Sequence, residues 1–197
     1  MKKLPDFIID KNEHILLHVC CAPCAAGCVE RLIAAYKKVT LFYSNSNLID
    51  QNEFDLRLKY VYQLAEYYNL PVIADEYNHS AWQDFTAGFA EAPEGGARCG
   101  LCFKFSLQRT AIMAEQGDFD VFATSLTVSP KKSSSLIFEL GRHFPKFRPW
   151  NFKKQSGYLL GTQLSKQLDF YRQNFCGCEY SFSASPVATR PMNTPPE

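Results

Sequence analysis

The sequence lacks several features that would place it in a specialised class. Its 197 residues include 3 Met, 2 Trp and 4 His, and the formal net charge is +1. No run of about 18 apolar residues is present, which is the length that a membrane-spanning helix needs. The segment from Met1 to Glu13 is charged and has no apolar stretch typical of a signal peptide. We therefore expect a cytoplasmic protein with no membrane partner and one domain with a substantial core.

A glycine-rich phosphate loop is also missing after the first predicted strand, residues 15–19. Cys20-Cys21-Ala22-Pro23-Cys24 occupies that position, which argues against ATP or dinucleotide binding there.

The charge is spread unevenly although the net charge is small. Residues 1–97 contain 8 Lys and Arg against 13 Asp and Glu, whereas residues 98–197 contain 13 against 7. The basic half includes the pairs Lys131-Lys132 and Lys153-Lys154. Such a group can bind RNA phosphates, although a solvated face without a ligand is the commoner meaning of this pattern.

What the sequence does have is cysteine in tight groups. Seven of its 8 cysteines form three clusters: Cys20, Cys21 and Cys24, then Cys99 and Cys102, and then Cys176 and Cys178. Thiols stay reduced in the cytoplasm, so grouped cysteines there indicate metal ligands or catalytic groups rather than disulfides. The eighth, Cys28, lies one helical turn after Cys24 and is expected to pack in the core.

Short apolar runs alternate with amphipathic stretches along the chain. Strands are predicted at residues 15–19, 39–43, 71–74, 119–125 and 147–152. Helices are predicted at residues 25–36, 51–68, 81–90, 101–116, 133–143 and 158–168. This alternation predicts a three-layer α/β domain with a mainly parallel sheet over residues 1–182. Residues 183–197 are rich in Pro, Ser and Thr, and a disordered tail is expected there.

Sites in such folds lie beyond the carboxyl ends of the strands. Cys20 and Cys21 directly follow the first predicted strand, and Ser125 closes the fourth, so these residues should meet at one edge of the sheet. A Cys-x-x-Cys at the start of a helix also gains thiolate character from the helix N-terminus. The sequence therefore predicts a cysteine-rich metal site at the carboxyl edge.

Three kinds of site are compatible with the cysteines alone. A structural zinc site closes with four ligands, and a dithiol redox enzyme needs only one Cys-x-x-Cys. An iron–sulfur cluster uses about four thiolates. Seven thiols exceed the needs of one zinc ion or one cluster. The surplus indicates a cluster with a further metal, or a cluster with reactive thiols.

Five segments taken together resemble the QueH-type epoxyqueuosine reductases. They are residues 16–24 (LLHVCCAPC), 42–47 (FYSNSN), 94–102 (EGGARCGLC), 124–132 (TSLTVSPKK) and 171–178 (YRQNFCGC). The resemblance runs from about His14 to Ser181. It implies a Rossmann-like (HUP-like) domain that reduces epoxyqueuosine to queuosine at the wobble position of tRNA, the last step of tRNA queuosine biosynthesis.

The resemblance also implies cofactors and partners. Family members are understood to carry a 4Fe–4S cluster beside a second iron ion, so the seven clustered cysteines are expected to be metal ligands. An electron donor protein or reductant is required, and no cobalamin-binding segment is visible. Residues expected to bind the tRNA substrate are Arg98, Lys131, Lys132, Lys153, Lys154 and Arg172. The alternative, from a different class, is a zinc-stabilised RNA-binding module without catalysis.

Overall fold

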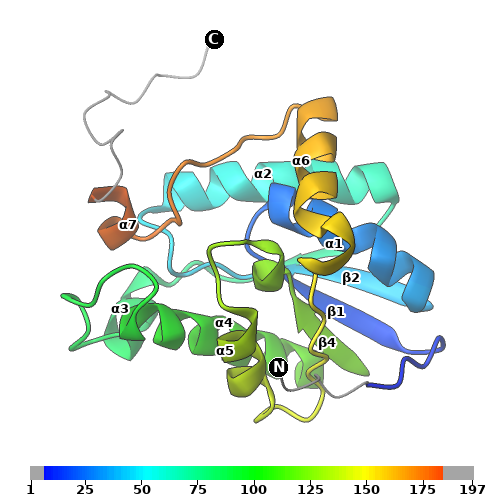
Figure 1. Ribbon diagram of the computed structural model, residues 1–197, viewed down its shortest axis with the longest axis horizontal. Coiled ribbons are helices and arrows are strands. Elements are labelled where there is room, and N and C mark those ends of the chain that lie inside the picture. The colour runs from blue at the N-terminus through cyan, green and yellow to red at the C-terminus, as the bar shows by residue number, and fades with distance from the viewer. Residues whose placement is uncertain (1–6, 184–197) are drawn as a thin grey trace.

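A single parallel sheet organises the computed structural model, which describes residues 7–183 (Figure 1). Its strands are β1 (His14–Val19), β2 (Lys38–Tyr43), β3 (Val72–Ala74) and β4 (Val121–Thr124), in the order β3-β2-β1-β4. Ile15 of β1 pairs with Val39 on one side and Val121 on the other. The strand order reverses between β1 and β4, and ligand sites of such sheets lie in the crevice beyond that point.

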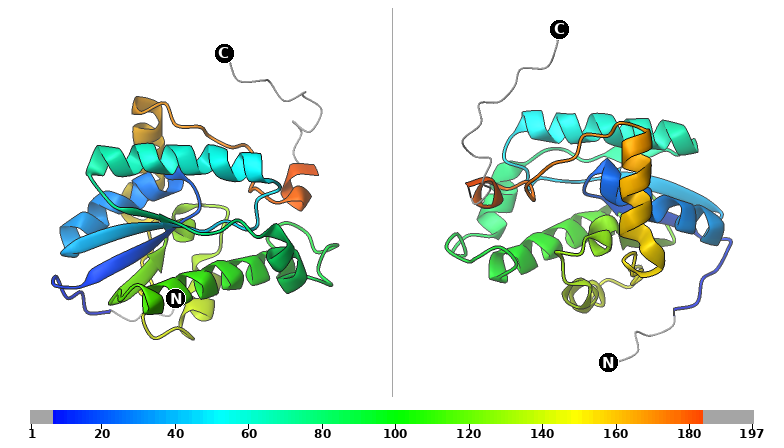
Figure 2. Two further views of the ribbon diagram at one scale, coloured as in Figure 1. Left: turned by 180° about the vertical axis from the view of Figure 1, so that it is seen from behind. Right: turned by 45° about the horizontal axis from the view of Figure 1, so that its top comes forward.

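Helices cover both faces of the sheet, so the domain has three layers (Figures 1 and 2). One face carries α1 (Ala22–Ala35), α2 (Gln51–Tyr68) and α6 (Gly157–Gln167). The other carries α4 (Ala97–Gln116) and α5 (Ser134–Gly141). Two short helices, α3 (His79–Phe85) and α7 (Glu179–Ser183), lie beyond the carboxyl ends of the strands, where the Trp82 and Tyr180 rings lie 6.4 Å apart in a tilted arrangement.

The core follows from the alternation of side chains along the strands. In β1, Ile15, Leu17 and Val19 are fully buried against the α1 and α2 layer. Leu16 is buried with Phe122 on the α4 and α5 side. Both faces of β1 are therefore apolar, as expected for a central parallel strand.

Helix α6 packs against α1 through glycines. A Cβ added to Gly27 would lie 2.2 Å from the carbonyl oxygen of Gly157, and one added to Gly161 would lie 2.5 Å from that of Pro23. These positions let the two helix backbones approach more closely than any side chain would allow.

The predicted three-layer α/β fold with a parallel sheet is confirmed, and the predicted bounds of α2 agree with the structure. The predicted fifth strand is wrong. In residues 147–152, Phe147 alone makes a parallel bridge, to Phe122. Pro149 follows closely and has no N–H to extend the ladder.

Two predicted helices differ from the observed bounds by four residues or more at one end. The one predicted at 81–90 is α3, which ends at Phe85, and Gly88 then adopts a φ of +81° that no helix allows. The one predicted at 101–116 is α4, which begins four residues earlier at Ala97 and so includes Cys99. Helix α7 was not predicted, and most of the expected tail, residues 184–197, lies outside the described part of the chain. Among residues 7–183, no helix has both the length and the hydropathy to cross a bilayer.

Candidate metal centre

Three cysteines meet where β1 passes into α1. Cys20 directly follows the strand, Cys21 is the N-cap of α1, and Cys24 lies in the first turn of that helix, after Pro23. Their Sγ atoms all lie within 4.8 Å of one another. Within residues 7–183 this is the one such group of three or more Cys, His, Asp or Glu side chains. We call Cys20, Cys21 and Cys24 the cysteine triad.

The pKa values of the three thiols in the triad are shifted in opposite directions. Hydrogen bonds from the Cys21 and Cys24 thiols hold the pKa of Cys20 well below its usual range, although burial opposes this effect. The hydrogen bond with Cys20 raises the pKa of Cys21 to about 12, and the pKa of Cys24 is also raised by its hydrogen bonds with Cys20 and Cys21. The Cys21 and Cys24 thiols therefore act as donors toward the Cys20 sulfur. A soft cation at this position would bind the thiolates in place of the thiol protons.

Two neighbours complete the surroundings of the triad. The Ser125 hydroxyl, just after β4, lies 3.4 Å from the Cys20 sulfur and accepts a 3.1 Å hydrogen bond from the Cys20 N–H. Cys28 is fully buried in the core, and its thiol donates to the Cys24 carbonyl at 3.2 Å. The predicted core position of Cys28 is confirmed.

The other four clustered cysteines line a separate cavity. Cys99 and Cys102 lie three residues apart near the start of α4, while Cys176 and Cys178 come from the loop before α7. Burial raises the pKa of Cys102, and the neighbouring Cys176, Cys178 and Cys99 add to the effect. We call these residues the cysteine tetrad. The rest of the lining is Asn47, Trp82, Glu94, Arg98, Phe103 and Ser181.

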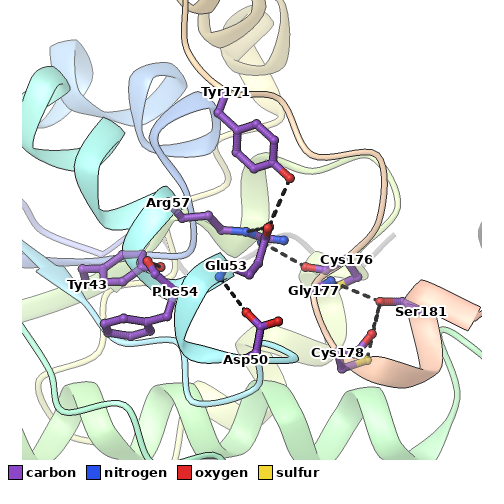
Figure 3. Close-up of polar contacts among 10 residues, drawn as sticks. All are labelled: Tyr43, Asp50, Glu53, Phe54, Arg57, Tyr171, Cys176, Gly177, Cys178 and Ser181. Carbon is purple, nitrogen blue, oxygen red and sulfur yellow. Dashed lines mark hydrogen bonds and ion pairs between the residues drawn. The ribbon is translucent and has the colours of Figure 1, made fainter. Parts of the chain in front are cut away.

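The loop that carries Cys176 and Cys178 is held from several sides (Figure 3). Gly177 has a φ of +137°, and its carbonyl accepts from the Ile49 N–H at 2.9 Å. The Ser181 hydroxyl accepts from the Gly177 N–H at 3.1 Å. A Cβ at Gly177 would lie 2.4 Å from Leu48, so only glycine allows this conformation and this close packing.

Two cations connect the triad and the tetrad electrostatically. Burial opposes the charge on half-buried Lys132, but Cys176, Cys20, Cys24 and Cys21 together raise its pKa. Burial also opposes the charge on Arg57, whereas Glu53 and Cys21 raise its pKa. The Arg57 Nη1 donates to the Cys176 carbonyl at 3.1 Å.

The six residues expected to bind substrate have different environments. Lys131, Lys154 and Arg172 are exposed, and Lys132 and Lys153 are half-buried. Lys153 Nζ donates to the Lys132 carbonyl. Arg98 is buried, and its Nη1 donates to the carbonyls of residues 89, 90 and 92, with its guanidinium 4.1 Å from the Tyr180 ring. Through these contacts Arg98 holds the backbone of residues 89–92 in place. Substrate binding by any of the six residues stays a prediction.

Sequence reasoning missed two residues at the tetrad. Arg57 is buried beside Cys176, and Trp82 lines the cavity. Arg57 Nη2 is buried and has no hydrogen-bond partner among the described residues, whereas the Trp82 side chain makes a hydrogen bond to Cys102 that opposes the rise in the pKa of this thiol. The signal for Arg57 was its position on the apolar face of α2, between Phe54 and Val61. A charged residue at such a position needs a partner.

A solved structure shares the fold. The chain superposes on the U34-tRNA thiolase NcsA from Methanococcus maripaludis, solved with its [4Fe-4S] cluster, with a TM-score of 0.55 and 11% identity. The match covers 88% of this chain and 61% of that one.

The matching family model and the named relatives all carry the same description. The family model described as Epoxyqueuosine reductase QueH matches residues 15–184. Proteins of that name from Acinetobacter baylyi and Streptococcus pyogenes are each 34% identical to this chain, over 91% and 85% of it and 83% and 69% of their own lengths. The protein of that name from Thermotoga maritima is 33% identical over 85% of this chain and 89% of its own. The chain therefore belongs to the epoxyqueuosine reductase QueH family.

Proposed function

We propose that this protein reduces epoxyqueuosine to queuosine at the wobble position of tRNA. The observation that carries the proposal is the convergence of three distant cysteine segments on the carboxyl edge of one parallel sheet. The named relatives, which match most of the chain, support the same reaction. Removal of the epoxide oxygen requires two electrons and two protons and releases one water molecule, so a redox centre is essential.

The cofactors that we propose are a 4Fe–4S cluster and a second iron ion. The tetrad offers the four thiolates that such a cluster usually takes. Its sulfurs are not gathered as closely as those of the triad, which suits a body larger than one ion. The triad, with its sulfurs within 4.8 Å, suits a single ion. The Trp82 side chain makes a hydrogen bond to Cys102 of the tetrad, and the buried Nη2 of Arg57 has no partner among the described residues.

Bound in these places, the cofactors would supply single electrons and a Lewis acid for the epoxide oxygen. The chain's own residues would set the environment. Lys132 keeps its positive charge near both cysteine groups and offsets the negative charge that the thiolates concentrate there. Ser125 holds the Cys20 sulfur and backbone in place.

The substrate would approach over the basic half of the chain. The modified base has to leave its neighbours in the anticodon loop to reach a buried centre, as recognition of single-stranded RNA bases usually requires. The exposed side chains of Lys131, Lys154 and Arg172 are suited to contact the flanking phosphates. We further propose that a protein or small reductant delivers electrons one at a time, and that cobalamin is not needed.

Reconstituted protein tests the proposal. The protein is purified without oxygen, its iron and sulfide are measured, and it is incubated with dithionite and tRNA that carries epoxyqueuosine. The tRNA is then digested and its nucleosides are analysed by mass spectrometry. We expect a product lighter by one oxygen atom, without added cobalamin. Fully metallated protein that binds the tRNA but leaves the epoxide intact would refute the proposal. A colourless zinc protein that binds tRNA would favour the non-catalytic alternative.

A further inference from the structure

Arg57 is a buried cation on the core face of α2. It is 3% exposed, and Phe54 and Val61 on the same face are buried with it. Burial of a guanidinium without partners is strongly unfavourable, so its contacts must offset that cost.

Its first set of contacts fixes the side chain from behind. The Nε of Arg57 donates to Glu53 Oε1 at 2.6 Å, one helical turn earlier in α2. The Tyr171 hydroxyl donates to the other oxygen of Glu53 at 3.2 Å (Figure 3). The guanidinium also lies over the Phe175 ring, with Cζ 5.5 Å from the ring centre. The head group therefore has one well-defined orientation.

Its second set of contacts points to the cysteine tetrad. Nη1 donates to the carbonyl of Cys176 at 3.1 Å (Figure 3). A Cβ on Gly177 would lie 3.2 Å from Nη2 and 3.3 Å from Nη1, so the guanidinium is in close contact with this loop. Nη2 is buried and has no hydrogen-bond partner among the described residues. A buried donor of this strength without a partner indicates that an acceptor belongs beside it.

We propose that Arg57 is a positioning residue for the metal centre, which orients the Cys176 loop through Nη1 and directs a fixed positive charge and the free Nη2–H toward the bound cofactor. The inference rests on the proposed function, because it assumes a redox-active cluster at the tetrad. A cation and an N–H donor near a cluster stabilise the state that holds the additional electron. Arg57 therefore raises the reduction potential, and Glu53, its acidic partner, lowers it.

Two substitutions of opposite sign test the proposal. Arg57→Gln removes the charge, so the reduction potential should become more negative. Glu53→Gln removes the opposing negative charge and keeps an oxygen for Arg57 Nε, so the potential should become less negative. Arg57→Lys keeps the charge and should restore most of the shift. Arg148→Gln is the control, because Arg148 forms a comparable ion pair with Glu13, 3.2 Å away, next to the amino end of β1.

The measurement is an anaerobic redox titration of each metal-loaded protein, followed by electron paramagnetic resonance, with iron and sulfide content measured on the same sample. If Arg57→Gln does not hold the cluster, the Glu53→Gln and Arg57→Lys proteins decide the question by the same titration. A loaded Arg57→Gln protein with the wild-type potential would overturn the inference, as would a Glu53→Gln shift in the negative direction. The titration contains no tRNA, so its result does not depend on whether the protein reduces epoxyqueuosine. A wild-type protein that fails to reduce epoxyqueuosine would refute the proposed function and leave this inference standing.

Discussion

The hydroxyl of Ser125 contacts Cys20 twice, with its oxygen 3.4 Å from the Cys20 sulfur and 3.1 Å from the Cys20 nitrogen. These residues come from the ends of β4 and β1, which are adjacent in the sheet. The pair therefore joins the two strands on either side of the strand-order reversal. It also provides a donor for the thiol in the triad whose pKa is lowest.

Ser125→Ala should weaken both the fold and the metal site. The buried Cys20 N–H would lose its acceptor, which costs about 1–3 kcal/mol in the free energy of unfolding. The Cys20 sulfur would lose a donor, so the iron content after anaerobic reconstitution should fall. Ser129→Ala is the matched control, because that hydroxyl accepts from the N–H of exposed Lys131 and makes no hydrogen bond with a cysteine among residues 7–183. Equal iron content in the two variants would show that the Ser125 contact does not support the site.

Serine substitutions at the cysteines should separate ligands from core residues. Replacing any one of the seven clustered cysteines should lower iron content or abolish turnover, because a hydroxyl is a far weaker ligand for iron than a thiolate. Cys28→Ser should keep the iron, since Cys28 packs in the core, and should cost only about 1 kcal/mol in stability. Metal analysis and urea unfolding of the variants check this prediction. Loss of iron in Cys28→Ser together with full iron in Cys178→Ser would contradict the assignment.

The close contact of α1 and α6 predicts that Gly27→Ala destabilises the protein. The new methyl group would meet the Gly157 backbone, which cannot move without shifting α6, so a loss of about 1–3 kcal/mol or more is expected. Gly100→Ala in α4 is the matched control. There the nearest atom, on Leu136, lies 3.8 Å away, and helix propensity favours alanine by about 1 kcal/mol. Thermal unfolding should separate the two variants, and a stable Gly27→Ala protein would mean that α6 can move away from α1.

Much of the fold could be predicted from local pattern. The apolar run before Cys20 indicated a buried strand, and the spacing in residues 51–68 indicated a helix. Both agree with the structure because each is a local property of the chain. The strand predicted at residues 147–152 is wrong for two reasons: Phe147 makes only a single bridge, to Phe122 of β4, which is a tertiary contact, and Pro149 has no N–H to continue the ladder, a local signal that the apolar pattern outweighed.

The grouping of the cysteines at the candidate metal site could be predicted, but their arrangement could not. That the cysteines would gather at the carboxyl edge followed from the topology of parallel sheets. Their division into a triad and a tetrad depends on how the loop at Cys176 packs against α2, and that packing is tertiary. Arg98 shows the same limit, because a basic residue beside a cysteine motif gave no sign that its guanidinium binds backbone carbonyls.

His14 should make the fold less stable in mild acid. Burial and the nearby Lys38 lower the pKa of His14 below its usual value of 6.5, although Asp120 opposes the effect. The unfolded chain therefore binds more protons below pH 6.5, and stability falls as the pH drops through that range. His14→Gln should lose less stability than the wild type between pH 7.5 and 5.5, about one unit on either side of that value. Urea unfolding at both pH values tests this, and identical losses would show that His14 does not titrate with folding.

The basic residues near the cysteine groups should contribute to tRNA binding through charge alone. Lys131 and Lys154 are exposed. The charge of Lys132 interacts with the nearby cysteines, and the Lys153 Nζ donates to the Lys132 carbonyl. Each lost phosphate contact reduces the slope of log K against log salt concentration by about 0.7–0.9. The double substitution Lys131→Gln and Lys154→Gln should therefore reduce that slope by about 1.5 and weaken binding at low salt.

The matched control is the exposed pair Lys37 and Lys38 at the amino end of β2, on the opposite edge of the sheet. Their double substitution to Gln makes the same change in net charge, so it should leave the slope nearly unchanged if the tRNA approaches the carboxyl edge. Fluorescence anisotropy with labelled tRNA over a range of salt concentrations measures both slopes. If the control pair reduces the slope and Lys131 with Lys154 does not, the RNA binds the opposite edge, away from the cysteines. That result would contradict the approach proposed for the substrate, because a base bound there could not reach the metal centre.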